Sequence, residues 1–121
     1  MVTSSSSPEL IWSIEQDTEG YLWLGTDAGA LRFDGVRVVP WDALMPVPRP
    51  SASVRTISIA RDGAIWFGLG EPGGIVVAQG SQVRAFGVSE GVPEGVVMAL
   101  TEDSRGTMWA AGRFGVVRFD G

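Results

Sequence analysis

The fold of this chain is decided by residues 17–35, which read DTEGYLWLGTDAGALRFDG. The same arrangement returns at residues 103–121, which read DSRGTMWAAGRFGVVRFDG. A third copy lies between them, and the shared positions keep a spacing of 43 residues, as Gly20, Gly63 and Gly106 and as Trp23, Trp66 and Trp109. A joint period in glycine, tryptophan and the segment that follows indicates tandem structural repeats.

Each repeat divides into short apolar segments separated by turn residues. The first segments cover residues 10–15, 54–60 and 96–102, and each second segment contains the repeat tryptophan. Third segments follow at 30–35, 75–80 and 116–121, and fourth segments at 36–39 and 82–86. Frequent glycine and proline and the lack of a helical period favour strands. We therefore predict an all-β fold of β-propeller blades: three four-stranded antiparallel repeats, the last lacking its outer strand, in an incomplete ring.

The repeat boundaries predict four parts of the chain. These are a disordered leader at residues 1–9, a first blade with its link at 10–53, a second blade with its link at 54–95, and a partial third blade at 96–121. Propellers usually close with four to eight blades. We expect further blades as partners, either from the same parent chain or from self-association. The leader has no cationic start and no apolar run, so it does not read as a signal peptide, and no direct membrane contact is expected of this segment.

Composition excludes several classes of function. The net charge is −5, and the nine basic residues, all arginine, are scattered, which argues against nucleic acid as a partner. The chain has no Cys and no His, so thiolate or histidine metal sites and a Ser-His-Asp site are excluded. We expect no enzyme, no cofactor and no metal. Asp17, Asp62 and Asp103 could suggest calcium, but their separate turns favour a turn-capping role.

Candidate ligand-binding residues lie in the loops of one face of the propeller. The link at 40–53 is the least repeat-like stretch, and long irregular loops on a rigid scaffold often carry function. From these loops we select Trp41, Asp42, Arg49, Glu71, Glu90 and Arg113 as candidates to contact a small molecule. For Trp41 the alternative is that it covers the outer edge of its blade. The repeat residues named above are expected to be structural, with each tryptophan packed between adjacent blades.

The repeat resembles that of the two-component regulator propeller family. The first repeat carries the pattern most fully, with Asp17, Gly20, Leu22, Trp23, Leu24, Gly25 and Thr26, and residues 90–96 are similar to the family's Gly-Leu-Pro-x-x-x-Val linker. The second repeat departs from it at Ala60 and Leu69, and the third at residues 110–112. The resemblance implies the sensor region of a hybrid two-component histidine kinase, located in the periplasm and binding a small, carbohydrate-derived molecule.

Two other functions stay open at this point. A propeller enzyme, such as a streptogramin lyase-like protein, also contains Gly-x-x-Trp, but such a lyase is expected to use His. A non-catalytic propeller fragment that assembles with itself and serves as an interaction scaffold is the other alternative.

Overall fold

Three antiparallel sheets follow one another along the chain in the computed structural model, which describes residues 10–41 and 53–119. Sheet 1 contains β1 (Ile11–Gln16), β2 (Leu22–Thr26), β3 (Gly29–Phe33) and β4 (Val38–Pro40). Sheet 2 contains β5 (Val54–Ile59), β6 (Ile65–Leu69), β7 (Ile75–Gln79) and β8 (Gln82–Phe86), and sheet 3 contains β9 (Val97–Glu102), β10 (Met108–Gly112) and β11 (Gly115–Phe119). The predicted blades, with three strands in the last, are confirmed over the described residues.

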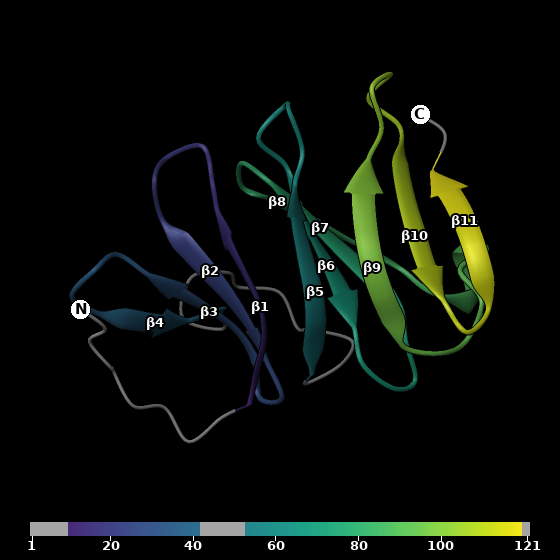
Figure 1. Cartoon of the computed structure of the whole chain (residues 1–121), viewed down its shortest axis with the longest axis horizontal. Helices are drawn as coiled ribbons and strands as arrows, with labels where there is room; N and C mark the ends of the chain where they lie inside the picture. Colours follow the sequence, from purple (N-terminus) through teal and green to yellow (C-terminus); the bar gives the residue numbers. More distant parts are fainter. Residues whose placement is uncertain (1–9, 42–52, 120–121) are drawn as a thin grey trace.

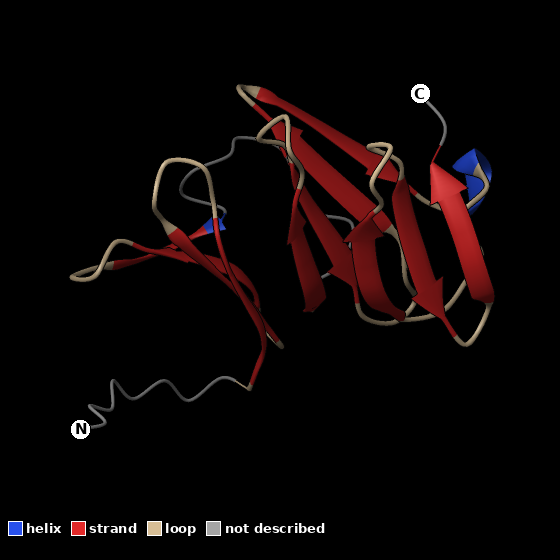
Figure 2. Ribbon diagram, turned by 45° about the horizontal axis from the view of Figure 1, so that its top comes forward, coloured by secondary structure: helices blue, strands red, loops and turns tan. Residues whose placement is uncertain are grey.

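The first strand of each sheet lies beside the first strand of the next. Figure 1 shows β1, β5 and β9 running next to one another through the middle of the molecule, with β2–β4 on one side and β10 and β11 on the other. Figure 2 shows that the sheets stand as separate layers and do not join into one sheet. This is the arrangement of successive propeller blades around a central channel, and we call β1, β5 and β9 the inner strands.

The turn after each inner strand has the same closure in all three sheets. In the first, the amide of Asp17 donates to the carbonyl of Tyr21 at 2.8 Å, and the amide of Gly20 donates to the carbonyl of Asp17. The corresponding pairs in the other turns are Ala60 with Ala64 and Asp103 with Thr107. Gly20 has a φ of +94°, and the other repeat glycines are similar, so a residue with a side chain would be strained there.

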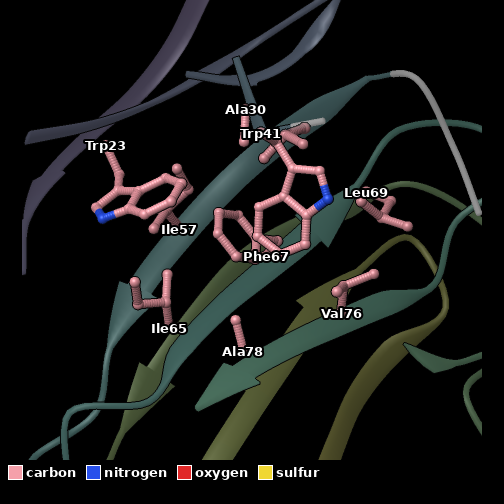
Figure 3. Packing of buried hydrophobic residues seen from close by; sticks show 10 residues of the cluster. Trp23, Ala30, Trp41, Ile57, Ile65, Phe67, Leu69, Val76 and Ala78 are labelled. Carbon is pink, nitrogen blue, oxygen red and sulfur yellow. The ribbon is translucent and has the colours of Figure 1, made fainter. Parts of the chain in front are cut away.

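Aromatic side chains fill the space between sheets 1 and 2. Trp23 from β2 and Trp41, which follows β4, both pack edge-on against Phe67 of β6, with ring centroids 5.6 and 4.7 Å apart. Figure 3 shows Trp41 and Phe67 together at the centre of this cluster. A second cluster joins sheets 2 and 3, where Trp66 packs against Phe119 at 5.2 Å. Trp23 and Trp66 therefore contact the sheet that follows their own.

The link between sheets 2 and 3 contains a short 3-10 helix, η1 (Val88–Glu90), which the sequence did not predict. The carboxylate of Glu90 accepts a hydrogen bond from the amide of Gly87 at 2.6 Å. Val92 is buried in the second cluster, and the amide of Gly95 donates to the carbonyl of Pro72. The link is thus fastened to both neighbouring sheets. Within the described ranges no helix is long and apolar enough to cross a membrane.

Candidate functional site

Each inner strand contains an irregularity at the same place in the repeat. Opposite β2, Ile11 pairs with Thr26 and Ser13 with Gly25, so Trp12 is an extra residue between two paired positions. The same two-against-one pairing leaves Arg55 extra in β5 and Met98 extra in β9. These are β-bulges, which re-aim a side chain and are frequent beside functional sites. We call Trp12, Arg55 and Met98 the bulge row.

Arg55 contacts both of the other side chains of the bulge row across the sheets. The guanidinium of Arg55 lies over the indole of Trp12, with its central carbon 3.8 Å from the ring centroid. An amino group of Arg55 lies 4.0 Å from the sulfur of Met98. The indole N–H of Trp12 donates to the carboxylate of Asp27 at 2.7 Å, and Asp27 belongs to the turn between β2 and β3. An arginine guanidinium therefore lies over an aromatic ring at the joint between sheets 1 and 2.

The bulge row is open to solvent at the end of the inner strands where the strand 2–strand 3 turns gather. Trp12 is 41% exposed and Met98 is 55% exposed, whereas the neighbouring Val54 and Val97 are buried. The bulged positions lie next to the residues that pair with Thr26, Leu69 and Gly112, the last residues of β2, β6 and β10. The row can offer a flat aromatic surface, a cation and a thioether to a molecule at this end of the channel.

Arg55 has no carboxylate partner among the described residues, although the chain is acidic overall. Among the described residues, the one carboxylate–cation pair within 4 Å joins Arg61 to Glu102, at 3.4 Å. Arg55 contacts a ring and a sulfur, neither of which is a strong hydrogen-bond acceptor. Among the described residues no carboxylate or carbonyl oxygen accepts from its guanidinium, so most of its N–H donors can serve solvent or a ligand.

Trp41 is not on a ligand-facing loop, and this corrects the sequence-based expectation. Its side chain is 2% exposed and lies between sheets 1 and 2, so it can neither stack on a ligand at the surface nor merely cover the outer edge of its blade. Its indole N–H has no hydrogen-bond partner among the described residues. The position is equivalent to Phe86, 45 residues later, which packs between sheets 2 and 3. Burial of the large ring outweighs the cost of one unpaired N–H.

Three of the other predicted contact residues, Glu71, Glu90 and Arg113, lie in different loops of the described part of the chain. Asp42 and Arg49 lie outside the described residues. Glu71 is exposed in the loop after β6, Arg113 is exposed in the turn between β10 and β11, and Glu90 is held by the amide of Gly87 in η1. Sequence reasoning missed Trp12, Arg55 and Met98. Their spacing of 43 matches the repeat, but the three residue types differ, so the spacing alone did not single them out.

The repeat aspartates cap turns. The carboxylate of Asp103 accepts from the amides of Arg105 and Thr107 and from the indole N–H of Trp109. The Trp109 hydrogen bond, followed by the Thr107 amide, lowers the pKa of Asp103 below its ordinary value. Asp17 makes the same contacts with Trp23, and Asp62 accepts from the Ala64 amide. No three acidic side chains gather into a possible metal site in the parts of the chain that the structure describes.

A hollow of ≈ 290 Å³ lies between sheets 2 and 3. Its lining includes Trp66, Phe119, Asp62 and Arg84. β3 in sheet 1 and β7 in sheet 2 hold the position that β11 has in sheet 3. β3 pairs with the outer strand β4 and β7 with the outer strand β8, whereas β11 pairs with β10 alone among the described strands. The hollow borders Phe119 of β11, a strand whose second edge is unpaired among the described strands, so we do not assign a ligand to it.

Comparison with known proteins agrees with the resemblance drawn from the repeat. Residues 5–28 match the family model described as two component regulator propeller. The chain superimposes on the extracellular domain of the proposed hybrid two component system BT3049 from B. thetaiotaomicron, with a TM-score of 0.71 and 27% identity over 89% of this chain. It spans 15% of that chain. The recognised resemblance is confirmed by these two matches.

Two structures of virginiamycin B lyase from Staphylococcus aureus are also similar. One, a catalytically inactive variant with quinupristin, has a TM-score of 0.69 at 14% identity and covers 98% of this chain and 44% of the lyase. The other, a selenomethionine form, has a TM-score of 0.64 at 16% identity and covers 91% of this chain and 41% of the lyase. At this identity the likeness shows the fold alone. No curated protein sequence matches the chain.

Proposed function

We propose that this chain is a segment of the ligand-sensing propeller of a two-component regulator, positioned outside the cytoplasm, and that it binds a small molecule without transforming it. The family match and the extracellular domain of a hybrid two component system support the sensor role. Because the chain spans 15% of that neighbour, the whole sensor contains further blades beside these three. A carbohydrate-derived ligand agrees with the family resemblance.

One observation carries the binding function, the bulge row. The same bulge in three successive blades places Trp12, Arg55 and Met98 in contact at one end of the inner strands. Ligand sites combine aromatic surface with a small number of placed polar groups. Here the indole of Trp12 is fixed by Asp27, so the aromatic surface is set before any ligand arrives.

Catalysis has less support. The inactive form of the similar lyase was obtained by replacing a histidine, and this chain contains no His. Among the described carboxylates, Asp34, Glu90 and Asp103 accept backbone amides in turns, and Asp27, beside the bulge row, accepts the indole N–H of Trp12. A binding role without chemistry accounts for all of these contacts.

The test is a thermal-shift screen of the intact chain with neutral and acidic mono- and oligosaccharides. We expect at least one compound to raise the midpoint of unfolding, because a ligand that binds only the native state stabilises it. Trp12→Ala should abolish the shift. Ile14→Ala, which removes another exposed apolar side chain of the same strand, should preserve it. A screen in which no compound stabilises the chain, or in which Trp12→Ala responds like the unsubstituted chain, contradicts the proposal.

A second candidate, assembly with another blade, is favoured by one observation on sheet 1. Ile14 is 58% exposed, whereas the equivalent Ile57 and Leu100 are 3% and 8% exposed because the preceding sheet covers them. A second copy of the chain could cover Ile14 with the Trp109 side of its sheet 3. If so, light scattering should show a solution mass that rises with the concentration of the chain. The Ile14→Glu variant should keep the monomer mass at every concentration. A monomer mass at every concentration removes this candidate.

A further inference from the structure

We infer that the bulge row selects ligands that carry a carboxylate, which the guanidinium of Arg55 receives. This inference rests on the proposed function and adds the chemical class of the ligand. It starts from the guanidinium of Arg55, whose central carbon lies over the Trp12 ring, 3.8 Å from the ring centroid. A guanidinium stacked on an aromatic face keeps its N–H donors pointing outward in its own plane, where a planar carboxylate can accept two of them.

The donors of Arg55 lack a strong acceptor within the described part of the chain. The two contacts of its guanidinium are the indole of Trp12 and the sulfur of Met98. The carboxylate of Asp27, which lies beside the bulge row, accepts the indole N–H of Trp12 at 2.7 Å. A half-buried cation whose donors contact only a ring and a thioether is stabilised more by an incoming anion than a cation that already has a carboxylate partner.

The surroundings favour a small organic carboxylate over inorganic phosphate. One guanidinium supplies a single planar fork, whereas phosphate carries more charge and more acceptor oxygens than one fork can satisfy. Trp12 and Met98 remain exposed beside the fork and offer apolar contact to the body of a ligand. The net charge of −5 disfavours highly charged anions in general, so local recognition by Arg55 has to outweigh that repulsion.

The experiment compares D-glucuronate with D-glucose, whose rings differ mainly by the carboxylate. Binding to the intact chain is followed by NMR through the Arg55 Nε–H and Trp12 Nε1–H resonances. We expect glucuronate to shift both signals saturably and glucose to bind about tenfold more weakly or worse, because a charge-assisted bidentate pair is lost. Arg55→Gln should weaken glucuronate by a similar factor. Arg55→Lys should weaken it less, since it keeps the charge and loses the fork.

The matched control is Arg105→Gln, which makes the same charge change in the turn between β9 and β10, at the other end of the inner strands. It should leave glucuronate affinity within about twofold, since exposed charges at a distance are screened by salt. Glucose binding as tightly as glucuronate overturns the carboxylate inference and leaves the sensor function standing. Equal binding by inorganic phosphate, unchanged affinity in Arg55→Gln, or no saturable shift with glucuronate also overturns it.

Discussion

At the scale of single residues, one carboxylate holds both the turn and the tryptophan of sheet 3. Asp103 accepts two backbone amides through one oxygen and the Trp109 indole through the other, each at 2.8–3.0 Å. Asp17 repeats this in sheet 1 with Trp23 at 2.8 Å. Sheet 2 has Ala60 at the same place, so Trp66 lacks the contact. The Asp-x-x-Gly-x-x-Trp pattern therefore encodes a specific hydrogen-bonded turn.

This turn predicts an acid-sensitive contribution to stability. The pKa of Asp103 is lowered in the folded chain, chiefly by the Trp109 hydrogen bond, from an ordinary value of 3.8. The stabilisation is therefore present above the unfolded pKa and is lost as the pH falls through the lower folded pKa. Asp103→Asn should lower the unfolding midpoint at neutral pH, and the difference from the unsubstituted chain should shrink at about pH 3 and below.

Urea unfolding at both pH values measures this, with Asp62→Asn as the control. Asp62 accepts one amide and holds no tryptophan, so its substitution should cost less. An Asp103→Asn chain as stable as the unsubstituted one at neutral pH, or a stability gap that persists unchanged in acid, would show that the carboxylate does not act in this way.

At the scale of strands, the bulge and the close approach of neighbouring sheets depend on small residues in the second strand. Gly25 pairs with Ser13 and Gly68 pairs with Thr56, next to the bulged Trp12 and Arg55. A Cβ at Gly68 would lie 2.5 Å from the methyl of Thr56 and 2.7 Å from a methyl of Val97 in the next inner strand. Glycine there lets β9 pack directly onto sheet 2.

Gly68→Ala should therefore loosen the joint between sheets 2 and 3. Overpacking of a well-filled interior typically costs about 1–3 kcal/mol, and denaturant unfolding of the variant should show a loss in that range. Ala111→Gly, the same exchange reversed at the equivalent position of sheet 3, should cost no more than about 1 kcal/mol. Equal stability of Gly68→Ala and the unsubstituted chain would mean that the sheets do not approach each other as closely as described.

The strands were largely predictable from sequence, and the bulges were not. The segment at 82–86 was predicted with the bounds that β8 has, because apolar positions and a preceding glycine mark it locally. A bulge is visible only in the pairing of two strands, so nothing within residues 10–15 alone marks Trp12 as the extra residue. The burial of Trp41 was missed for a related reason, since an insertion of two residues hides its equivalence to Phe86.

At the scale of the whole molecule, the repeat determines both the fold and the surfaces left open. Trp23 and Trp66 are each covered by the next sheet, and Ile57 and Leu100 by the preceding one. Trp109 and Ile14 hold the same positions on the outward sides of sheets 3 and 1 among the described residues. The fold class could be predicted from the repeat, whereas the proposed ligand site lies where three inner strands meet, a relation between repeats that no single repeat contains.

The central claim is that successive sheets pack as propeller blades with their inner strands side by side, which brings the bulge row together. Nuclear Overhauser spectroscopy on the intact, isotope-labelled chain tests it most directly. The account predicts contacts between Trp12 and Arg55, between Trp23 and Phe67, and between Trp66 and Phe119, in addition to those within each sheet. Contacts confined to single sheets, with none across the two joints, would contradict the blade arrangement and with it the proposed binding site.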